Sequence, residues 1–213
     1  MTNYENPMLS EADKKGSADD AEVLKNCRAE LLKPGENSWK TIRQDIMDIE
    51  HSAYKEEETF DEETLQEDLE NPTSIVAILR DTTTGKIIGY SYAQPTSVVY
   101  PEFYPERKHA KNTAYITNTA IHPQYQKKRL LPVLLKKLED ELKEKGYAFI
   151  ERDSADNREK VKEKEETYAD KIKKNNADRI IAEEQWSSED YGQQRFFRIR
   201  LEKELAAKKA RKH

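Results

Sequence analysis

The sequence lacks the residues on which several classes of protein depend. It has one cysteine, Cys27, so no disulfide can form within the chain and no CxxC zinc motif exists. Its four histidines are scattered without ligand spacing, so we expect no metal site. No apolar run approaches the roughly 20 residues that a membrane helix needs. The first residues, MTNYENPMLSEADKKG, have no apolar stretch typical of a secretory signal. We therefore expect a soluble cytoplasmic protein without a membrane partner.

Glycine is also scarce, and this excludes several nucleotide sites. The six glycines, at positions 16, 35, 85, 89, 146 and 192, form no glycine-rich loop. The chain contains no GxxxxGK[ST] phosphate loop, no GxGxxG dinucleotide fingerprint and no GxSxG nucleophile elbow. Carboxylates are too numerous for any chosen pair to indicate a catalytic site without geometry.

The charge is high but nearly balanced. Charged residues make up 37% of the 213 residues, hydrophobic residues 35%, and the net charge is −5. This balance does not favour a nucleic-acid partner, which usually meets a basic domain. Composition predicts a loose arm over residues 1–20, one domain over 21–202 and a basic tail over 203–213, interpreted as a solvated end.

Hydrophobic periodicity predicts four helices. The first follows an N-cap at Ser38, and its apolar residues recur at helical spacing up to Ala53. The second is capped by Asp61 and stopped by Asn71-Pro72. A leucine-rich helix begins near Pro132 and ends at Gly146, and a polar helix is expected over residues 157–174.

Strands are predicted between these helices. Ser74–Leu79 and Ile87–Ala93 flank a turn and form a hairpin, and a loop with two prolines, Pro101 and Pro105, leads to Thr113–Ile121. The remaining strands are Tyr147–Glu151, Arg179–Trp186, Gln194–Leu201 and a possible strand over Val23–Leu32. The order predicts an α+β fold, with a mostly antiparallel mixed sheet, one strand–helix–strand crossover and helices packed on the sheet.

The junction between Ile121 and the helix near Pro132 is the strongest candidate for a binding site. A strand that turns directly into a helix presents unpaired backbone N–H groups and the positive end of the helix dipole to an anion. Lys127, Lys128 and Arg129 lie in this turn and add full positive charge. An exposed loop whose basic side chains are merely solvated is the alternative.

The segment around this junction resembles a known family. TAYITNTAIHPQYQKKRLLPVLLKKLEDELKEKGYAFIERDSADN is similar to the core motif of the GCN5-related N-acetyltransferase (GNAT) superfamily. Ile121-His122-Pro123 matches the V-x-P step of that motif, and Gln126 occupies the first position of [QR]-x-x-G-x-[GA]. The ending YGQQRFFRIRL resembles the final strand of many bacterial members. The resemblance covers about residues 21–202 and implies a GNAT-like fold with helices on both faces of the sheet.

The resemblance implies transfer of an acetyl group from acetyl-CoA to an amine by direct attack. The backbone of Thr119, Ala120 and Ile121 would pair with pantetheine, and the loop of Gln126, Lys127, Lys128, Arg129, Leu130 and Leu131 would hold the pyrophosphate. Asn157 matches an asparagine that contacts the cofactor in the family. Tyr168, on the later helix, would be the general acid, and Glu151 is the carboxylate to test as base.

Two departures from the motif leave the function open. Arg129 and Leu131 stand where the family has small residues that allow the backbone close to phosphate. Arg129 could pair with phosphate directly, or its bulk could block the site. The chain is therefore either an active acetyltransferase for a small-molecule or peptide amine, or an inactive scaffold of the same fold that has lost CoA binding. The acceptor amine and the oligomeric state are not readable from the sequence.

Overall fold

A seven-stranded mixed sheet organises the protein. The computed structural model describes residues 18–32, 39–103, 107–108, 110–156, 166–188 and 192–202. Within these ranges the strand order is β1-β2-β3-β4-β5-β7-β6, and only β4 and β5 run parallel. The strands are β1 (Cys27–Leu31), β2 (Ile75–Asp81), β3 (Ile87–Pro95), β4 (Thr113–Ile121), β5 (Phe149–Ala155), β6 (Ile180–Ser188) and β7 (Gly192–Arg200). The predicted fold class is confirmed.

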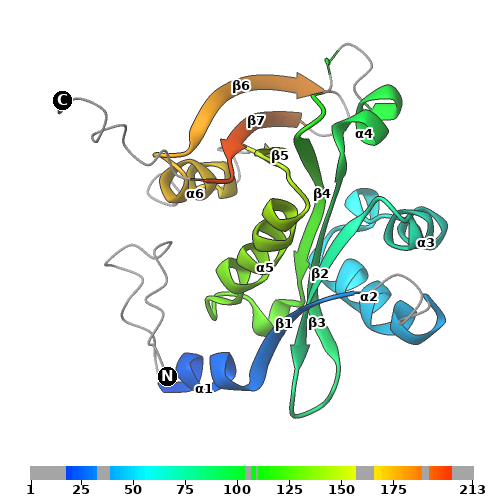
Figure 1. The fold of residues 1–213 in the computed structure, drawn as a ribbon. Coiled ribbons are helices and arrows are strands. Elements are labelled where there is room, and N and C mark those ends of the chain that lie inside the picture. Colours follow the sequence, from blue (N-terminus) through cyan, green and yellow to red (C-terminus); the bar gives the residue numbers. More distant parts are fainter. Residues whose placement is uncertain are drawn as a thin grey trace.

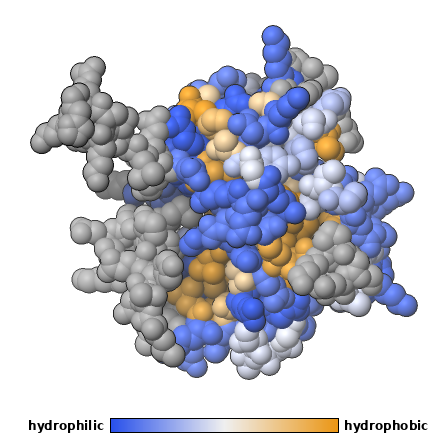
Figure 2. All heavy atoms as spheres, in the orientation of Figure 1, coloured by the Kyte–Doolittle hydropathy of each residue, from blue (hydrophilic) through white to orange (hydrophobic). Residues whose placement is uncertain are grey.

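Helices cover both faces of the sheet, each through its own apolar stripe. On one face lie α2 (Trp39–Ala53) and α3 (Glu62–Glu70), and on the other α5 (Leu130–Glu144) and α6 (Tyr168–Asn175), as Figure 1 shows. Leucines recur along the buried side of α5 at Leu130, Leu134, Leu138 and Leu142. Figure 2 shows hydrophilic side chains over the outward face of this helix. The two cores are therefore separated by the sheet, as the alternation of its strands requires.

Several predicted elements are confirmed, with boundaries that differ by up to two residues in the hairpin strands. The helix expected to end at Ala53 is α2, and the hairpin is β2–β3. The Asp61 side chain accepts a hydrogen bond of 2.9 Å from the backbone N–H of Thr64, so it caps α3 as expected. Gly146, with φ of 85°, follows α5 in the left-handed region that stops a helix.

Other expectations are corrected. Residues 18–26 form helix α1, so only Cys27–Leu31 of the expected strand over Val23–Leu32 is a strand, and residues 18–20 of the expected arm are helical. Ala, Glu, Leu and Lys, which favour helices, dominate this segment. Helix α4 (Thr96–Phe103) replaces part of the expected proline loop. The later helix begins only at Tyr168, after a capping box on Thr167, while residues 157–165 lie outside the described ranges.

The two parallel strands pair over a short distance and then separate. The ladder between β4 and β5 contains Thr113↔Phe149, Ala114↔Ile150 and Tyr115↔Glu151, although β4 continues to Ile121. A bulge in the β3–β4 ladder pairs Tyr92 with Asn118 and Ala93 with Ile116, which leaves Thr117 without an opposite residue. Because the bulge shifts the alternation by one residue, Ile116 and Thr119 both face α5. The separation opens the sheet at its centre.

The core beneath α5 should be sensitive to truncation. Leu134 is fully buried on the inner side of α5, so Leu134→Ala should lower the free energy of unfolding by about 2–5 kcal/mol, through lost burial and a residual cavity. Leu135, half-buried and facing the cleft described below, gives a matched control on the same helix, with a loss of roughly 1 kcal/mol for Leu135→Ala. Urea unfolding measures both, and equal losses would contradict this assignment of the core.

Candidate active site

A cleft opens where β4 and β5 separate. Its volume is about 810 Å³, and it is bounded by β4, the β4–α5 loop, α5, β5 and α6. Eight residues singled out from the sequence line it: Thr119, Ile121, Gln126, Lys127, Arg129, Leu130, Leu131 and Tyr168. The walls are apolar at Ile116 and Ile150, on the two separated strands. Such a mixture of apolar walls and a few polar groups is typical of a small-molecule site.

The free edge of β4 turns alternate backbone groups toward this cleft. The N–H of His122 donates to the carbonyl of Ile88, so Ala120 and Asn118 also bond to β3, while Thr119 and Ile121 point the other way. The carbonyl of Ile121 accepts a hydrogen bond of 2.9 Å from the Gln126 side chain. Thr119 and Ile121 therefore meet the cleft with their backbones, whereas Ala120 is committed to the sheet.

The β4–α5 loop adopts backbone conformations that usually belong to glycine. Arg129, the residue before α5, has φ of 61° and ψ of 21°, and Lys127 has φ of 62°. This left-handed conformation costs a residue with a side chain roughly 1–2 kcal/mol. The glycine of the family motif corresponds to Arg129, so an arginine here adopts a backbone conformation that glycine adopts without strain. The first N–H groups of α5 follow directly and carry the positive end of its dipole.

Four cationic side chains from the loop and from α6 line the cleft. Lys127 and Arg129 come from the loop, and Lys171 and Lys174 come from α6. Lys174 forms an ion pair of 2.9 Å with Glu166, which offsets part of its charge. Together with the dipole of α5, these residues make the cleft suited to a polyanion such as a phosphate group.

Tyr168 lies in the cleft beside an arginine that the sequence analysis did not single out. Nη2 of Arg152 donates a hydrogen bond of 3.2 Å to the Tyr168 hydroxyl, and its guanidinium carbon lies 5.3 Å from the centre of the Tyr168 ring. Arg152 belongs to β5, on the same side as Ile150, and is buried. Since the bond is donated to Tyr168, the hydroxyl proton of Tyr168 can point elsewhere.

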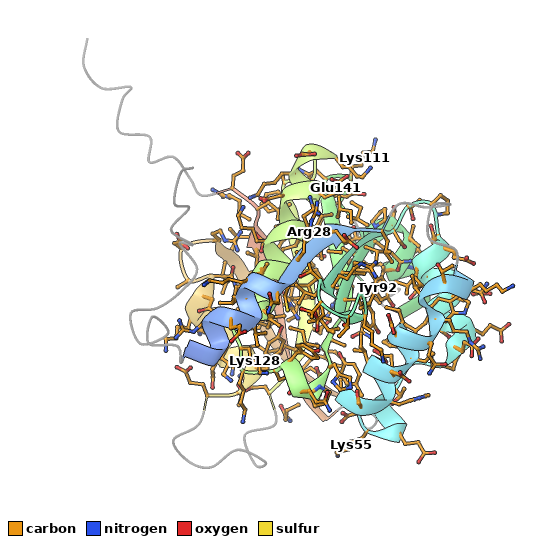
Figure 3. All side chains as sticks on the ribbon, turned by 90° about the horizontal axis from the view of Figure 1, so that it is seen from below. Arg28, Lys55, Tyr92, Lys111, Lys128 and Glu141 are labelled. Atoms are coloured by element: carbon orange, nitrogen blue, oxygen red, sulfur yellow. The ribbon has the colours of Figure 1, made fainter. Side chains whose placement is uncertain are left out.

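Besides Ala120, the structure leaves three further expected site residues away from the cleft or outside the described ranges. Glu151 points to the opposite face of the sheet, where it accepts a bond from the Tyr100 hydroxyl and pairs with Arg198 Nε at 2.8 Å; burial raises its pKa. Lys128 lies beside α1 (Figure 3), with Nζ 5.6 Å from the centre of the Tyr125 ring. Asn157 lies outside the described residues.

A buried polar network behind β4 was also missed. Glu50 is fully buried and accepts hydrogen bonds from the Tyr90 hydroxyl, from Asn118 Nδ2 at 3.0 Å and from the N–H of Phe60 at 3.2 Å. The Tyr54 hydroxyl is 2.7 Å from Asn118 Oδ1 and 2.8 Å from the carbonyl of Thr119, and Tyr54 lines the cleft. Tyr92, between the sheet and the helices α2 and α3 in Figure 3, donates to Asp68.

Sequence patterns could have indicated two of these residues. Glu50 follows Ile46 by four positions and Ile49 by one, so it lies on the apolar stripe of α2, where a carboxylate is unusual. Arg152 shares the side of Ile150 in a strand with alternating orientation. Tyr54 follows the end of α2, and no periodicity indicates its direction.

Comparison with known proteins identifies the fold and the family of this chain. The model of the acetyltransferase (GNAT) family matches residues 39–162. The ribosomal-protein-S18-alanine N-acetyltransferase from Escherichia coli has a TM-score of 0.55 and 15% identity, over 82% of this chain and 94% of that one. For an aminoglycoside 6'-acetyltransferase type Ii the values are 0.58, 12%, 82% and 97%. For yncA from Salmonella typhimurium, a structure with its cofactor acetyl-CoA, they are 0.51, 15%, 85% and 97%. No curated protein matches the sequence.

The described residues contain neither a metal-binding cluster nor a membrane-spanning helix. Within those ranges, no three or more histidine, cysteine, aspartate or glutamate side chains are grouped so that they could hold a metal ion. None of the helices described there combines the length and apolar character needed to cross a bilayer.

The raised pKa of the buried Glu50 carboxyl predicts that the stability of the protein depends on pH. Because burial raises its pKa above the ordinary 4.5, the folded protein keeps this proton at pH values where the unfolded chain has lost it. The contribution of Glu50 to the free energy of unfolding is therefore fully present below about pH 4.5 and is lost as the pH rises through the raised pKa. Glu50→Gln removes this titration, so the stability advantage of the wild type over the variant should shrink as the pH rises above about 4.5.

Urea unfolding at a series of pH values measures this difference. Glu67→Gln, at an exposed position of α3, controls for the loss of one carboxyl group. A wild-type advantage over Glu50→Gln that grows with pH would show the opposite sign and contradict the assignment.

Proposed function

The chain belongs to the acetyltransferase (GNAT) family, and from that premise we propose that it transfers an acetyl group from acetyl-CoA to an amine. Acyl transfer follows from the family, whereas the acetyl donor and the amine acceptor are our proposal. The observation that carries it is the separation of β4 from β5, which ends at a loop and helix terminus surrounded by cations. This arrangement suits a long ligand with an apolar arm and phosphates at one end.

We place acetyl-CoA with its phosphates at the Gln126–Leu131 loop. Backbone N–H groups at the start of α5, together with Lys127 and Arg129, would bind the pyrophosphate, and Lys171 would add a cation from across the cleft. The pantetheine arm would lie along Ile121 and Thr119 toward the point where the strands part. The Tyr54 hydroxyl already bonds to the Thr119 carbonyl, and the Thr119 N–H donates to Asn118 Oδ1 at 2.7 Å. The arm would therefore use the backbone of Ile121 or displace these bonds.

In the proposed reaction, the neutral amine attacks the thioester carbonyl carbon. The new C–N bond forms as the C–S bond breaks, and the electron pair leaves with sulfur. Tyr168 would donate its hydroxyl proton to the thiolate, with Arg152 holding the ring in place. The attacking nitrogen must also lose a proton, which would pass to solvent water. Glu151 would take it instead if the amine arrives from the opposite face of the sheet, where this carboxylate lies beside Tyr100.

An inactive scaffold is the alternative, favoured by one observation. Arg129 and Leu131 occupy the two positions where the family motif has small residues, and both line the cleft. If their side chains fill the phosphate site, the fold would persist without CoA binding. The left-handed backbone of Arg129 supports the active form, because the loop keeps the path that a glycine would take.

Calorimetric titration with acetyl-CoA at low salt separates the two functions. We expect binding in the micromolar range that weakens as salt rises, because screening reduces the attraction between the cations and the phosphates. Arg129→Gly and Arg129→Ala should each weaken binding by about tenfold, since both remove the charge. The free energy of unfolding should be about 1 kcal/mol higher for Arg129→Gly than for Arg129→Ala, because glycine relieves the strain of the left-handed backbone and alanine keeps it. No binding at millimolar acetyl-CoA to a folded protein would exclude the enzyme.

Tyr168→Phe tests the proposed general acid. Loss of the hydroxyl should lower kcat by about ten- to hundredfold and change the KM for acetyl-CoA little, because the hydroxyl acts on the leaving thiolate. Tyr147→Phe, which alters a tyrosine outside the lining of the cleft, is the matched control and should keep kcat. Steady-state kinetics on the acceptor found by an amine screen gives both values, and an unchanged kcat for Tyr168→Phe removes this role.

A further inference from the structure

Arg152 differs from the other buried arginines of the described chain in what it contacts. Arg195 pairs with Asp156 and Asp170, and Arg179 pairs with Glu139 at 2.7 Å. Arg152 is only 6% exposed, yet in the described residues its hydrogen bond and its ring contact are both with Tyr168. Its Nε has no hydrogen-bond partner there. Within that part of the chain, its charge therefore has no carboxylate beside it.

A buried cation without an anion is expensive. Removing a guanidinium from water is strongly unfavourable unless a charged partner compensates for the lost hydration. Arg152 lines the cleft, so an anion that enters the cleft with a ligand can provide the compensation. A carboxylate suits this site because its two oxygens match the fork of the guanidinium.

The place of Arg152 separates it from the phosphate end of the cleft. It follows Glu151, which pairs with Tyr115, so it lies at the level of Ile116, where the strands part. The phosphates are placed at the loop beyond Ile121, and five residues of extended strand span about 17 Å. Arg152 also contacts Tyr168, the proposed acid to the thiolate. An anion at Arg152 would therefore lie near the reacting thioester.

We propose that Arg152 binds a carboxylate at the reacting end of the ligands, so that the enzyme prefers substrates carrying one there. This inference rests on the proposed function, because it assumes an acyl-CoA in the cleft. The carboxylate has two possible sources: the far end of a dicarboxylic acyl group on CoA, or the amine acceptor. Arg152 is then the residue that sets substrate specificity, in addition to holding Tyr168.

The first experiment measures the donor by calorimetry. Succinyl-CoA and butyryl-CoA have acyl chains of equal carbon number and differ in the terminal carboxylate, and acetyl-CoA and free CoA complete the series. If the carboxylate belongs to the donor, the wild type should bind succinyl-CoA about tenfold more tightly than butyryl-CoA, and Arg152→Gln should abolish this preference. Lys173→Gln removes a charge from α6 outside the lining of the cleft and should keep the preference.

The second experiment measures the acceptor with acetyl-CoA as donor. Amino acids are compared with the amines that lack only the carboxylate, by kcat/KM. If the acceptor supplies the carboxylate, the wild type should favour the amino acids, and Arg152→Gln should lose that preference while its KM for acetyl-CoA stays unchanged. A purely structural role for Arg152 would affect both acceptors alike.

Stability provides an independent readout. Because no carboxylate of the described residues pairs with Arg152, its removal should leave the Tm of Arg152→Gln equal to or above that of the wild type without ligand. If that variant does not fold, Arg152→Lys keeps the charge without the fork and should reduce the preference. Two results together overturn the inference while acetyl-CoA still binds. Succinyl-CoA and butyryl-CoA bind with equal affinity, and carboxylate-bearing acceptors are either not preferred or not turned over. Failure of free CoA and every acyl-CoA to bind removes the proposed function itself.

Discussion

The rest of the structure depends on the short pairing between β4 and β5. Three residue pairs hold these parallel strands together, and beyond Tyr115 and Glu151 the sheet opens. Parallel strands inside a sheet normally continue their ladder, since each unmade backbone bond in a buried place is costly. Here side chains replace part of the ladder, with Gln126 on the carbonyl of Ile121 and Tyr54 on that of Thr119. These side-chain bonds stabilise the separated end of β4, and the cleft beside it remains open to a ligand.

Much of the fold could be predicted from the sequence because local patterns and tertiary structure agree. The leucine stripe of α5, the Asp61 cap and the hairpin turn are each recognisable within a few residues. Helix α4 was missed because Pro101 suggested a loop, whereas the structure accommodates it inside the last turn of a helix packed on the sheet. Helix α1 was missed because its apolar residues, Val23 and Leu24, resemble the start of a strand.

The sequence indicated which loop contributes to the site, but not which side chains from different strands and helices meet there. The resemblance located the loop from Gln126 to Leu131, and the structure brings most of it to the cleft. Which side of the sheet a strand residue faces depends on register, and the bulge at Thr117 comes from the pairing of β3 with β4. The left-handed backbone at Arg129 was equally hidden, because a side chain gives no local signal for a conformation that it disfavours.

The bulge also changes, within the single strand β4, the alternation of the residues that face α5. Before Thr117 the residues facing α5 are Ala114 and Ile116, and after it they are Thr119 and Ile121. Asn118 can therefore join the buried network of Glu50 while its neighbour Thr119 borders the cleft. If Thr117 took a regular place opposite Tyr92, the last four residues of the strand would turn to the opposite faces of the sheet at once. In this segment the register with β3 is therefore a stricter requirement than the chemical nature of any single side chain.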